Sequence, residues 1–317
     1  MVGGVTTLVT GGAGFIGSHL VEKLLHDGPV VVLDNFNDFY DPERKEANLA
    51  VARARPGFTL ERGDLRDAAL VRGVLRRHRI DSVVHLAAFA GVRPSVENAR
   101  QYVQNNLEGT QSMLDACVEH RVERLVFASS SSVYGNAGAR PSREDSPADR
   151  PVSPYAATKR AGELLCHATH ATDGLHVTCL RFFSAVGPRQ RPDLAVHKFA
   201  RLVRQGAPLT LFGDGTSERD YTHVLDLVDG ISSALERCKG FDVINLGAGQ
   251  PVRLIDLVRH IGNAVGREPR IEFEPMQRGD VDATMADLTR ARDRLGYAPR
   301  RGIELAVRDL CDWLEQA

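Results

Sequence analysis

Short runs of apolar residues alternate with helical patterns along the first half of the chain. The apolar runs predict strands at residues 5–10, 30–33, 58–61, 82–86, 124–128 and 176–181, and the helical patterns predict helices at residues 15–25, 102–119 and 154–170. Strands that alternate with helices are joined by right-handed crossovers into a parallel sheet. We therefore predict an α/β fold with a doubly wound parallel sheet.

The pattern loosens after about residue 181. Prolines and glycines mark loops there, at Pro188, Pro192, Pro208, Gly213 and Gly215. Helices are predicted near residues 194–205 and 254–265. We expect a first domain at residues 1–180 and a smaller mixed α/β region at residues 181–317, interleaved with the first.

Charge, hydropathy and cysteine content argue against several classes of protein. The formal net charge is -1 and no basic block is present, so we expect no nucleic-acid partner. The longest apolar runs are too short to span a bilayer, and the N-terminus lacks a signal-peptide pattern. The five cysteines are scattered without CxxC spacing, which indicates neither disulfides nor zinc. We expect a cytoplasmic protein without a membrane partner or a metal site.

A glycine-rich turn follows the first predicted strand. Gly11, Gly14 and Gly17 lie in the segment Gly-Gly-Ala-Gly-Phe-Ile-Gly, which opens the first predicted helix. Backbone N–H groups at a helix N-terminus point at an anion, and glycines let the backbone approach it closely. The spacing is GxxGxxG rather than GxGxxG, and such a trio alone can be a packing turn. Its position between a strand and a helix favours a dinucleotide-diphosphate site in a Rossmann-type fold.

Two aspartates follow predicted strands near this turn. Asp34 ends the second strand, 17 residues after Gly17. A carboxylate there accepts hydrogen bonds from the adenosine ribose and repels a 2′-phosphate, which favours NAD over NADP; the alternative is a surface-turn aspartate. Asp64 and Leu65 follow the third strand, where an adenine contact is expected, although an aspartate after a strand is also an ordinary helix cap.

Tyr155 and Lys159 are four residues apart on a predicted helix and so share one face. An ammonium beside a phenol lowers the phenol pKa, which makes the phenol a usable general base near neutral pH. Such pairs also occur by chance on exposed helices. Ser130 belongs to a serine run, residues 129–132, at the C-terminal end of the fifth strand, where parallel sheets bind ligands. Its hydroxyl can pass a substrate proton toward Tyr155.

With these groups in place, the chain resembles the extended short-chain dehydrogenase/reductase family, in its nucleotide-sugar epimerase and dehydratase branch. The segments that carry the resemblance are Thr-Gly-Gly-Ala-Gly-Phe-Ile-Gly-Ser-His at 10–19, Gly-Asp-Leu at 63–65, His-Leu-Ala-Ala at 85–88, Asn-Asn-Leu-Glu-Gly-Thr at 105–110, Ser-Ser-Val-Tyr-Gly at 131–135, Tyr155 with Lys159, and Arg-Asp-Tyr-Thr-His-Val at 219–224. They extend over essentially the whole chain. The resemblance implies that residues 1–180 bind NAD and that residues 181–317 bind a nucleotide sugar.

The resemblance also implies roles for individual residues. Ser130, Tyr155 and Lys159 take the catalytic positions. The residues implied to contact NAD are Gly11, Gly14, Phe15, Ile16, Gly17, Asp34, Asn35, Asp64, Leu65, Ala87, Asn106, Tyr155 and Lys159. Those implied to contact a UDP-sugar are Arg93, Ser130, Ser184, Arg191, Lys198, Phe212, Arg219 and Asp280, with Arg219 at the diphosphate. A homodimer that pairs the helices around residues 102–119 and 154–170 is implied as well.

The residues at positions 131 and 132 distinguish between the reactions that members of this branch catalyse. Sugar-nucleotide 4,6-dehydratases carry Asp-Glu where this chain has Ser131 and Ser132, and glucuronate decarboxylases carry Glu at the position of Ser132. Serines near their ordinary pKa cannot remove the elements of water. The remaining reaction is 4-epimerisation: oxidation at C4, rotation of the keto-sugar and reduction on its opposite face.

The identity of the sugar is indicated by segments that resemble UDP-glucuronate 4-epimerases. They are residues 34–42 with Lys45 and Leu49, 90–93, 181–184, 187–188, 191–193 and 276–281. Ser184 stands where those enzymes commonly have Thr and UDP-glucose 4-epimerases usually have Asn. Arg191 is the candidate for the C6 carboxylate, which a guanidinium binds through two parallel hydrogen bonds; a solvent-exposed loop arginine or a phosphate contact is the alternative.

We therefore expect conversion of UDP-glucuronate to UDP-galacturonate. A UDP-glucose or UDP-N-acetylglucosamine 4-epimerase and, more distantly, a net keto-sugar oxidoreductase remain as alternatives.

Overall fold

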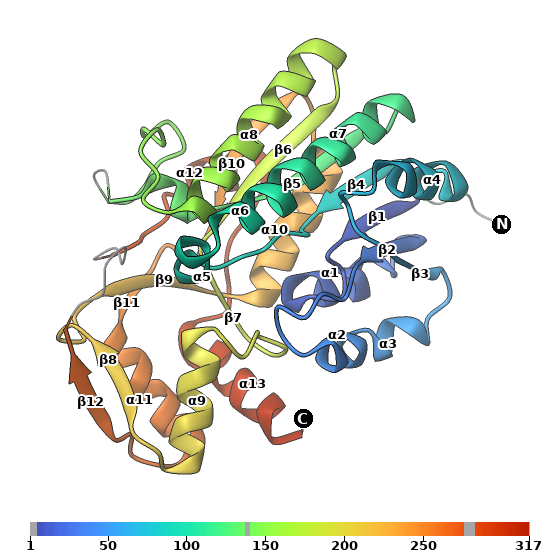
Figure 1. Ribbon diagram of the computed structural model, residues 1–317. Coiled ribbons are helices and arrows are strands. Elements are labelled where there is room, and N and C mark those ends of the chain that lie inside the picture. The colour runs from blue at the N-terminus through green and yellow to red at the C-terminus, as the bar shows by residue number, and fades with distance from the viewer. Residues whose placement is uncertain (1–4, 137–139, 276–282, 317) are drawn as a thin grey trace.

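The computed structural model describes residues 5–136, 140–275 and 283–316. Within these residues, seven parallel strands form the central sheet, in the order β10-β6-β5-β4-β1-β2-β3 (Figure 1). The strands are β1 (Thr7–Thr10), β2 (Val30–Asp34), β3 (Phe58–Arg62), β4 (Ser82–His85), β5 (Arg124–Ser130), β6 (His176–Phe182) and β10 (Phe241–Leu246). The predicted α/β fold with a Rossmann-type, doubly wound parallel sheet is confirmed.

Alternate residues of the strands enter two separate hydrophobic cores. Val9, Val32 and Val84 face one core, whereas Leu8 and Val83 face the other, and all five are fully buried. Successive side chains of a strand point to opposite faces, so a sheet covered on both faces needs continuous apolar runs. This explains why the strands lack the apolar-polar alternation of half-exposed sheets.

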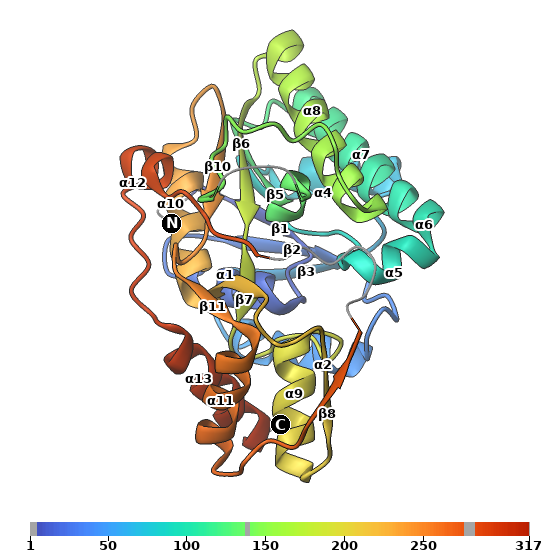
Figure 2. The same ribbon diagram turned by 90° about the vertical axis from the view of Figure 1, so that its left-hand side faces the viewer.

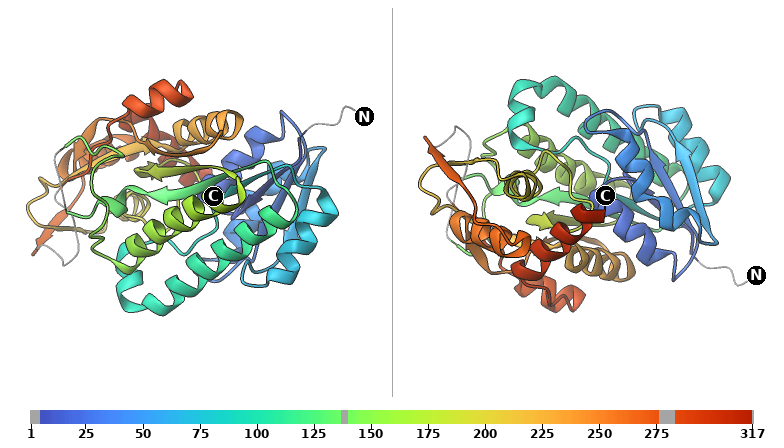
Figure 3. Two further views of the ribbon diagram at one scale, coloured as in Figure 1. Left: turned by 90° about the horizontal axis from the view of Figure 1, so that it is seen from above. Right: turned by 90° about the horizontal axis from the view of Figure 1, so that it is seen from below.

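Helices cover both faces of the sheet, as Figure 3 shows. On one face lie α1 (Phe15–Leu24), α10 (Val224–Arg237) and α12 (Thr289–Leu295), and on the other lie α4 (Ala68–His78), α7 (Gly109–Glu119) and α8 (Pro154–Asp173). Two short helices, α2 (Pro42–Asn48) and α3 (Ala50–Arg53), connect β2 to β3.

The helix predicted at residues 102–119 is not continuous. The chain forms α5 (Val92–Glu97), α6 (Ala99–Val103), a π-helical turn η1 (Gln104–Glu108) and then α7. Asn106, inside the π-helical turn, exchanges hydrogen bonds with the backbone of Phe89, from Phe89 N to Oδ1 at 2.8 Å and from Nδ2 to Phe89 O at 3.0 Å. This long-range pairing favours a local π-helical turn, which sequence periodicity does not reveal.

The second region lies at the carboxyl ends of the parallel strands (Figure 2). In its described part, β11 (Pro251–Arg253), β9 (Glu218–His223) and β7 (Ser184–Val186) form one small sheet, and β12 (Ile271–Glu274) and β8 (Leu209–Phe212) form another. The helices α9 (Ala195–Gln205), α11 (Leu254–Val265) and α13 (Ile303–Gln316) pack beside them around a third core.

The chain crosses between the two regions more than once. The strand β10 pairs with β6 along its whole length, and α10 and α12 pack on the main sheet, although all three follow residue 181. The division at residue 180 therefore stays a proposal about function, since the main sheet is built from both sides of it.

Three further features concern the described residues alone. None of their helices combines the length and the apolar character needed to cross a membrane. Their His, Cys, Asp and Glu side chains include no group of three or more arranged to hold a metal ion. The five cysteines are free thiols and are buried.

Candidate active site

A cavity of about 990 Å³ lies at the carboxyl ends of the strands, between the main sheet and the second region. The predicted site residues that line it are Gly11, Gly14, Phe15, Ile16, Gly17, Asp34, Asn35, Asp64, Leu65, Ala87, Arg93, Ser130, Tyr155, Lys159, Ser184, Arg191, Lys198, Phe212 and Arg219. Asn106 lies behind the lining, and Asp280, like the whole segment 276–281, falls outside the described residues. The fold therefore brings together residues that are up to about two hundred positions apart in the sequence.

The glycine turn leaves no room for side chains. Gly11 has a φ of 68°, and a Cβ there would lie 2.8 Å from the backbone of Ala87. A Cβ on Gly17 would collide with the carbonyl oxygen of Gly11. Helix α1 begins at Phe15 directly after the turn, and no side chain caps its N-terminus. Open backbone N–H groups at the edge of the cavity fit the diphosphate of a dinucleotide.

Asp34 is fixed at the end of β2. Its carboxylate accepts hydrogen bonds from the backbone N–H groups of Ala13, at 3.1 Å, and Phe36, at 2.9 Å. Burial raises the pKa of Asp34, and the two backbone donors oppose that shift. Each oxygen keeps a lone pair, so the carboxylate can accept a further hydrogen bond, and its contact with the ribose remains a prediction.

Asp64 forms a turn with Arg66. Its carboxylate accepts hydrogen bonds from the Arg66 side chain at 2.9 and 2.7 Å, and from Asn35 Nδ2 at 3.3 Å. The Arg66 guanidinium lowers the pKa of Asp64 to about 2. Its contact with adenine remains a prediction.

Helix α8 presents Tyr155 and Lys159 to the cavity. The helix begins at Pro154, and the Ser153 side chain caps it by accepting a hydrogen bond from Ala156 N at 3.2 Å. The Tyr155 hydroxyl is hydrogen-bonded to Ser130, whose Oγ also accepts from Ser132 Oγ at 2.9 Å. The serine lies at the junction of β5 with the short 3₁₀ turn η2 (Ser131–Tyr134). The predicted catalytic trio is thus brought to one wall.

The electrostatics of this trio differ from the sequence-based expectation. Burial raises the pKa of Tyr155, and the groups that oppose the shift are the Ser130 hydroxyl and Arg191, not Lys159. Burial also lowers the pKa of Lys159 to about 8. The Lys159 ammonium donates to Ala128 O at 2.7 Å. The expectation of a phenol made acidic by the ammonium is therefore wrong, because burial raises the pKa of Tyr155 and Lys159 is not among the groups that lower it.

A buried ion pair that the sequence analysis missed holds this wall together. Glu163 accepts two hydrogen bonds from Arg181, at 2.8 and 2.9 Å, and one from Ser129 Oγ at 2.6 Å. Burial acts to raise the pKa of Glu163, but the hydrogen bonds and charge of Arg181 outweigh it and the pKa is lowered. Glu163 follows Lys159 by one helical turn, so its place on the inward face of α8 was the signal available.

Aromatic rings extend from this wall to the other side of the cavity. The Tyr155 and Tyr102 rings pack edge to face, with their centres 6.2 Å apart. The centre of the Tyr102 ring lies 6.0 Å from that of Phe89, whose ring centre lies 5.4 Å from that of Phe39. Because Asn106 fixes the Phe89 backbone and donates to Thr158 Oγ1 at 3.0 Å, the structure places it as a support for these rings. Its predicted contact with NAD is untested.

Arg191 lines the cavity as well. Its Nε and Nη2 donate to the two carboxylate oxygens of Asp193 at 3.0 and 2.8 Å, and Nη2 also donates to Ala90 O at 3.1 Å. Its guanidinium lies 5.0 Å from the centre of the Phe39 ring. The sequence indicates Arg191 as a candidate, whereas no pattern in it indicates a role for Asp193 or Phe39.

Further charged and aromatic side chains belong to the lining. The Arg93 guanidinium lies over the Phe212 ring at 5.0 Å, and Arg219 Nη1 donates to Glu218 O at 2.9 Å. The Tyr40 hydroxyl is buried and has no hydrogen-bond partner among the described residues. It belongs to the segment 34–42 that was noted in the sequence for its resemblance alone.

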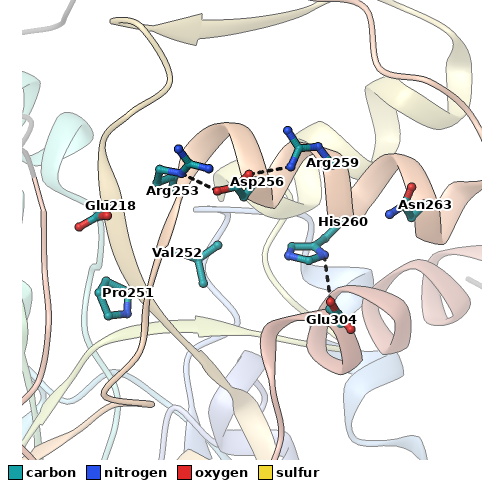
Figure 4. A pocket seen from close by; sticks show the side chains of 9 residues that line it. All are labelled: Glu218, Pro251, Val252, Arg253, Asp256, Arg259, His260, Asn263 and Glu304. Atoms are coloured by element: carbon teal, nitrogen blue, oxygen red, sulfur yellow. Dashed lines mark hydrogen bonds and ion pairs between the residues drawn. The ribbon is translucent and has the colours of Figure 1, made fainter.

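A second pocket, of about 420 Å³, lies on the other side of β9 (Figure 4). Glu218 lines it, whereas the next residue, Arg219, lines the large cavity, because neighbouring side chains of a strand face opposite ways. Asp256 pairs there with Arg253 at 2.6 Å and with Arg259 at 2.9 Å. Since these charges satisfy one another, and no predicted site residue lies there, the chemistry belongs to the large cavity.

The fold and the cavity together define a class: a Rossmann-type protein with a dinucleotide-diphosphate turn and a Ser–Tyr–Lys wall. The sequence model described as "NAD dependent epimerase/dehydratase family" matches residues 7–247. The chain belongs to this family, and its cofactor is NAD.

Curated relatives and solved structures are similar to this chain over nearly its whole length. The UDP-glucuronate 4-epimerase of Thermodesulfobacterium geofontis is 35% identical over 311 residues, which cover 98% of this chain and 96% of that protein. The crystal structure of UDP-glucuronic acid 4-epimerase from Bacillus cereus, in complex with UDP-glucuronic acid and NAD, superposes with a TM-score of 0.93 at 35% identity and covers 98% of this chain and 99% of that one. The UDP-glucose 4-epimerase of Thermus thermophilus, in complex with NAD, gives a TM-score of 0.89 at 34% identity and covers 99% and 100%.

Proposed function

We propose that this protein is an isomerase, an NAD-dependent UDP-glucuronate 4-epimerase that forms UDP-galacturonate. The observation that carries the proposal is that Ser130, Tyr155 and Arg191 line one cavity with the glycine turn of α1. A candidate proton-transfer wall and a guanidinium that could bind a sugar carboxylate thus line one substrate-sized space. The similarity to UDP-glucuronate 4-epimerases over 98% of the chain supports the same substrate.

In the proposed reaction, Tyr155 accepts the proton of the C4 hydroxyl, with Ser130 hydrogen-bonded to both groups. Bound NAD supplies a hydride acceptor for C4 and a hydride donor for the return step. Arg219 holds the diphosphate while the 4-keto-sugar turns about its diphosphate linkage. Tyr155 then returns the proton, and the reaction ends with the C4 configuration inverted and no net oxidation.

A carboxylate at C6 sets a further requirement. Oxidation of C4 produces a β-keto acid, which loses CO₂ when the breaking bond stands perpendicular to the carbonyl plane. Arg191 is 15% exposed in its side chain and is held by Asp193, Ala90 and Phe39. A guanidinium fixed in this way can hold the carboxylate in the orientation that does not react.

Alternatives remain within the same machinery. A dehydratase needs an acid and a base where this chain has Ser131 and Ser132, both of which line the cavity. A UDP-glucose 4-epimerase is the nearer alternative, and the match to the Thermus thermophilus enzyme is consistent with it. Arg191 favours the acidic sugar, since a hydroxymethyl group offers no charge for a guanidinium.

We also propose a homodimer, in the cytoplasm, formed through α6, α7 and α8. Val96, Val103 and Leu164, on α5, α6 and α8, are large apolar side chains with exposures of 65%, 44% and 54%. These helices pack together on one face of the sheet, so the apolar positions belong to one outer surface. The buried, free thiols of the described residues suit a reducing compartment.

The proposed function is tested by incubating the purified protein with UDP-glucuronate or UDP-glucose, without added cofactor, and separating the products by stereochemistry. We expect UDP-galacturonate and little UDP-galactose. The variant Tyr155→Phe should be slower by a factor of about 10² to 10⁴, which is the range for loss of a general acid-base. Fast turnover of UDP-glucose beside slow turnover of UDP-glucuronate would overturn the choice of sugar.

A further inference from the structure

The surroundings of Arg191 leave few of its donors for a ligand. A guanidinium carries five N–H groups, on Nε, Nη1 and Nη2. Asp193 takes one from Nε and one from Nη2, and the carbonyl of Ala90 takes the other from Nη2. Only Nη1 makes no hydrogen bond to a described residue. The planar edge that suits a carboxylate best is thus already occupied by a carboxylate of the chain.

A sugar carboxylate and Asp193 therefore compete for one guanidinium. The Asp193 side chain is 37% exposed, whereas that of Arg191 is 15% exposed, so the aspartate has more open space into which it can turn. The Phe39 ring and the Ala90 carbonyl hold the guanidinium whether or not the aspartate stays. An incoming carboxylate can therefore replace Asp193 at the same edge without moving Arg191.

Building on the proposed function, we propose that Asp193 is a specificity-determining residue that stands in for the sugar carboxylate. In the free protein it neutralises Arg191. When the C6 carboxylate of the sugar binds, Asp193 moves away and the sugar carboxylate takes its place at the guanidinium of Arg191. While the 4-keto-sugar turns between the two faces, the sugar carboxylate must leave Arg191, and Asp193 pairs with the guanidinium again until the carboxylate returns.

This role predicts a particular split between binding and turnover. Without the aspartate charge, the sugar carboxylate meets an unopposed guanidinium and binds more tightly. The same change makes release during rotation harder, because nothing neutralises Arg191 when the carboxylate leaves. A side chain that merely positioned Arg191 would show the opposite effect on binding, since its loss would leave the guanidinium less ordered.

The test uses Asp193→Asn, which keeps the shape and one acceptor but removes the charge. Binding is measured by calorimetry in a Tyr155→Phe background, where slow chemistry leaves the added nucleotide sugar intact. We expect UDP-glucuronate to bind about tenfold more tightly, as loss of one competing charge-assisted hydrogen bond allows, and UDP-glucose to bind no more tightly. Weaker binding of UDP-glucuronate, or equal changes for both sugars, would overturn the proposal.

Kinetics on the parent background supply the second readout. With Asp193→Asn, both KM and kcat for UDP-glucuronate should fall several-fold. The matched control is Asp38→Asn, an exposed carboxylate in the segment before Phe39 that does not line the cavity, for which we expect neither change. A kcat that falls while KM rises would contradict the role of Asp193. If the parent protein forms no UDP-galacturonate, the proposed function fails, whereas the calorimetric comparison still decides the role of Asp193.

Discussion

At the scale of single residues, burial shifts the pKa values of Tyr155 and Lys159, the two titratable side chains that α8 presents to the cavity. Tyr155 and Lys159 both lie inside the protein, and burial raises the pKa of the phenol and lowers that of the ammonium. In each case the neutral form is favoured over the charged one. The Ser130 hydroxyl and the Arg191 guanidinium are the groups that oppose this rise in the pKa of Tyr155, so both favour its phenolate form.

Lys159 gives a pH-dependent stability that can be measured. Its pKa falls from the ordinary 10.5 to about 8 in the folded protein. Below about pH 8 the ammonium is charged in both the folded protein and the unfolded chain. Burial of this charge then lowers the free energy of unfolding by its full amount. Above that pH the folded protein releases the proton while the unfolded chain keeps it, so the free energy of unfolding rises until about pH 10.5. Lys159→Met removes this contribution.

We therefore expect the free energy of unfolding of the parent, relative to Lys159→Met, to increase between pH 7 and pH 9.5. Urea unfolding of both proteins at several pH values measures the difference, in which the other titrating groups cancel. A difference that stays constant, or that shrinks as the pH rises, would show that the ammonium is not destabilised in the fold.

The glycine turn supplies another single-residue prediction. A methyl group at position 17 would collide with the Gly11 carbonyl and lie 2.8 Å from Gly12 Cα, so Gly17→Ala must displace the turn. We expect the affinity for NAD to fall at least tenfold, measured by titration of protein freed of cofactor. Gly302→Ala is the control, because a Cβ there meets nothing within 4 Å. Equal affinities for the two variants would remove the turn from the cofactor site.

Single residues were also where sequence reasoning reached furthest. Tyr155 and Ser130 could be predicted because they stand on a predicted helix face and at a predicted strand end, whereas Arg191 was indicated by the resemblance of its segment and by the chemistry of a guanidinium. Asp193 was not found, because an aspartate two residues after an arginine in a loop has no periodicity to indicate its partner. Only the folded loop shows that both carboxylate oxygens face Arg191.

At the scale of elements, α8 is fastened to β5 and β6 by the pair of Glu163 and Arg181. Their side chains are 1% and 3% exposed. The Glu163 carboxylate also accepts a hydrogen bond from Ser129, the neighbour of Ser130. Lys159, on the same helix, donates a hydrogen bond to the carbonyl oxygen of Ala128. The position of α8 relative to the end of β5, and with it the distance between Tyr155 and Ser130, is therefore held by contacts of Lys159 and Glu163 with Ala128 and Ser129.

Glu163→Ala should reduce the free energy of unfolding by about 3–5 kcal/mol, because it leaves the Arg181 guanidinium buried without its partner. Activity should fall as well, since Ser129 loses its acceptor. Chemical denaturation of the variant and the parent measures the first effect. Asp145→Ala is the matched control: Asp145 pairs with Arg143 at the surface, both 61% exposed, and its loss should change stability by at most about 1 kcal/mol. Similar losses for both variants would contradict the importance of the buried pair.

Helices and strands could be predicted from the sequence where the spacing of apolar residues alone determines them. The predicted strands at residues 30–33 and 58–61 are each one residue shorter than β2 and β3. The break at η1 could not be predicted, because it depends on Asn106 pairing with Phe89, 17 positions away. The helices α2 and α3 were also missed, since their short patterns lie inside a segment noted only for its polar and aromatic residues.

At the scale of the whole molecule, two regions share one sheet. Strand β10 closes the edge beside β6, and α10 covers the face of β5 and β6 with Leu227 and Ile231, both fully buried. The loosened pattern after about residue 181 favours a second region interleaved with the first, but it predicts no strand at β10. The active site lies where the chain crosses from one region to the other, which explains why its residues come from both halves.

This sharing leads to a prediction for the isolated first region. A fragment of residues 1–180 lacks β10, α10 and α12, so Val126 and Leu180 would be exposed along one face of the sheet. We expect the fragment to show no cooperative thermal unfolding in calorimetry and no binding of NAD in a fluorescence titration, although it holds the whole glycine turn. Co-expression with residues 181–317 should restore both properties, because the missing strand and helices then complete the sheet. Cooperative unfolding of the fragment alone would mean that the sheet is stable without its seventh strand, and that residue 180 is a structural boundary as well as a functional one.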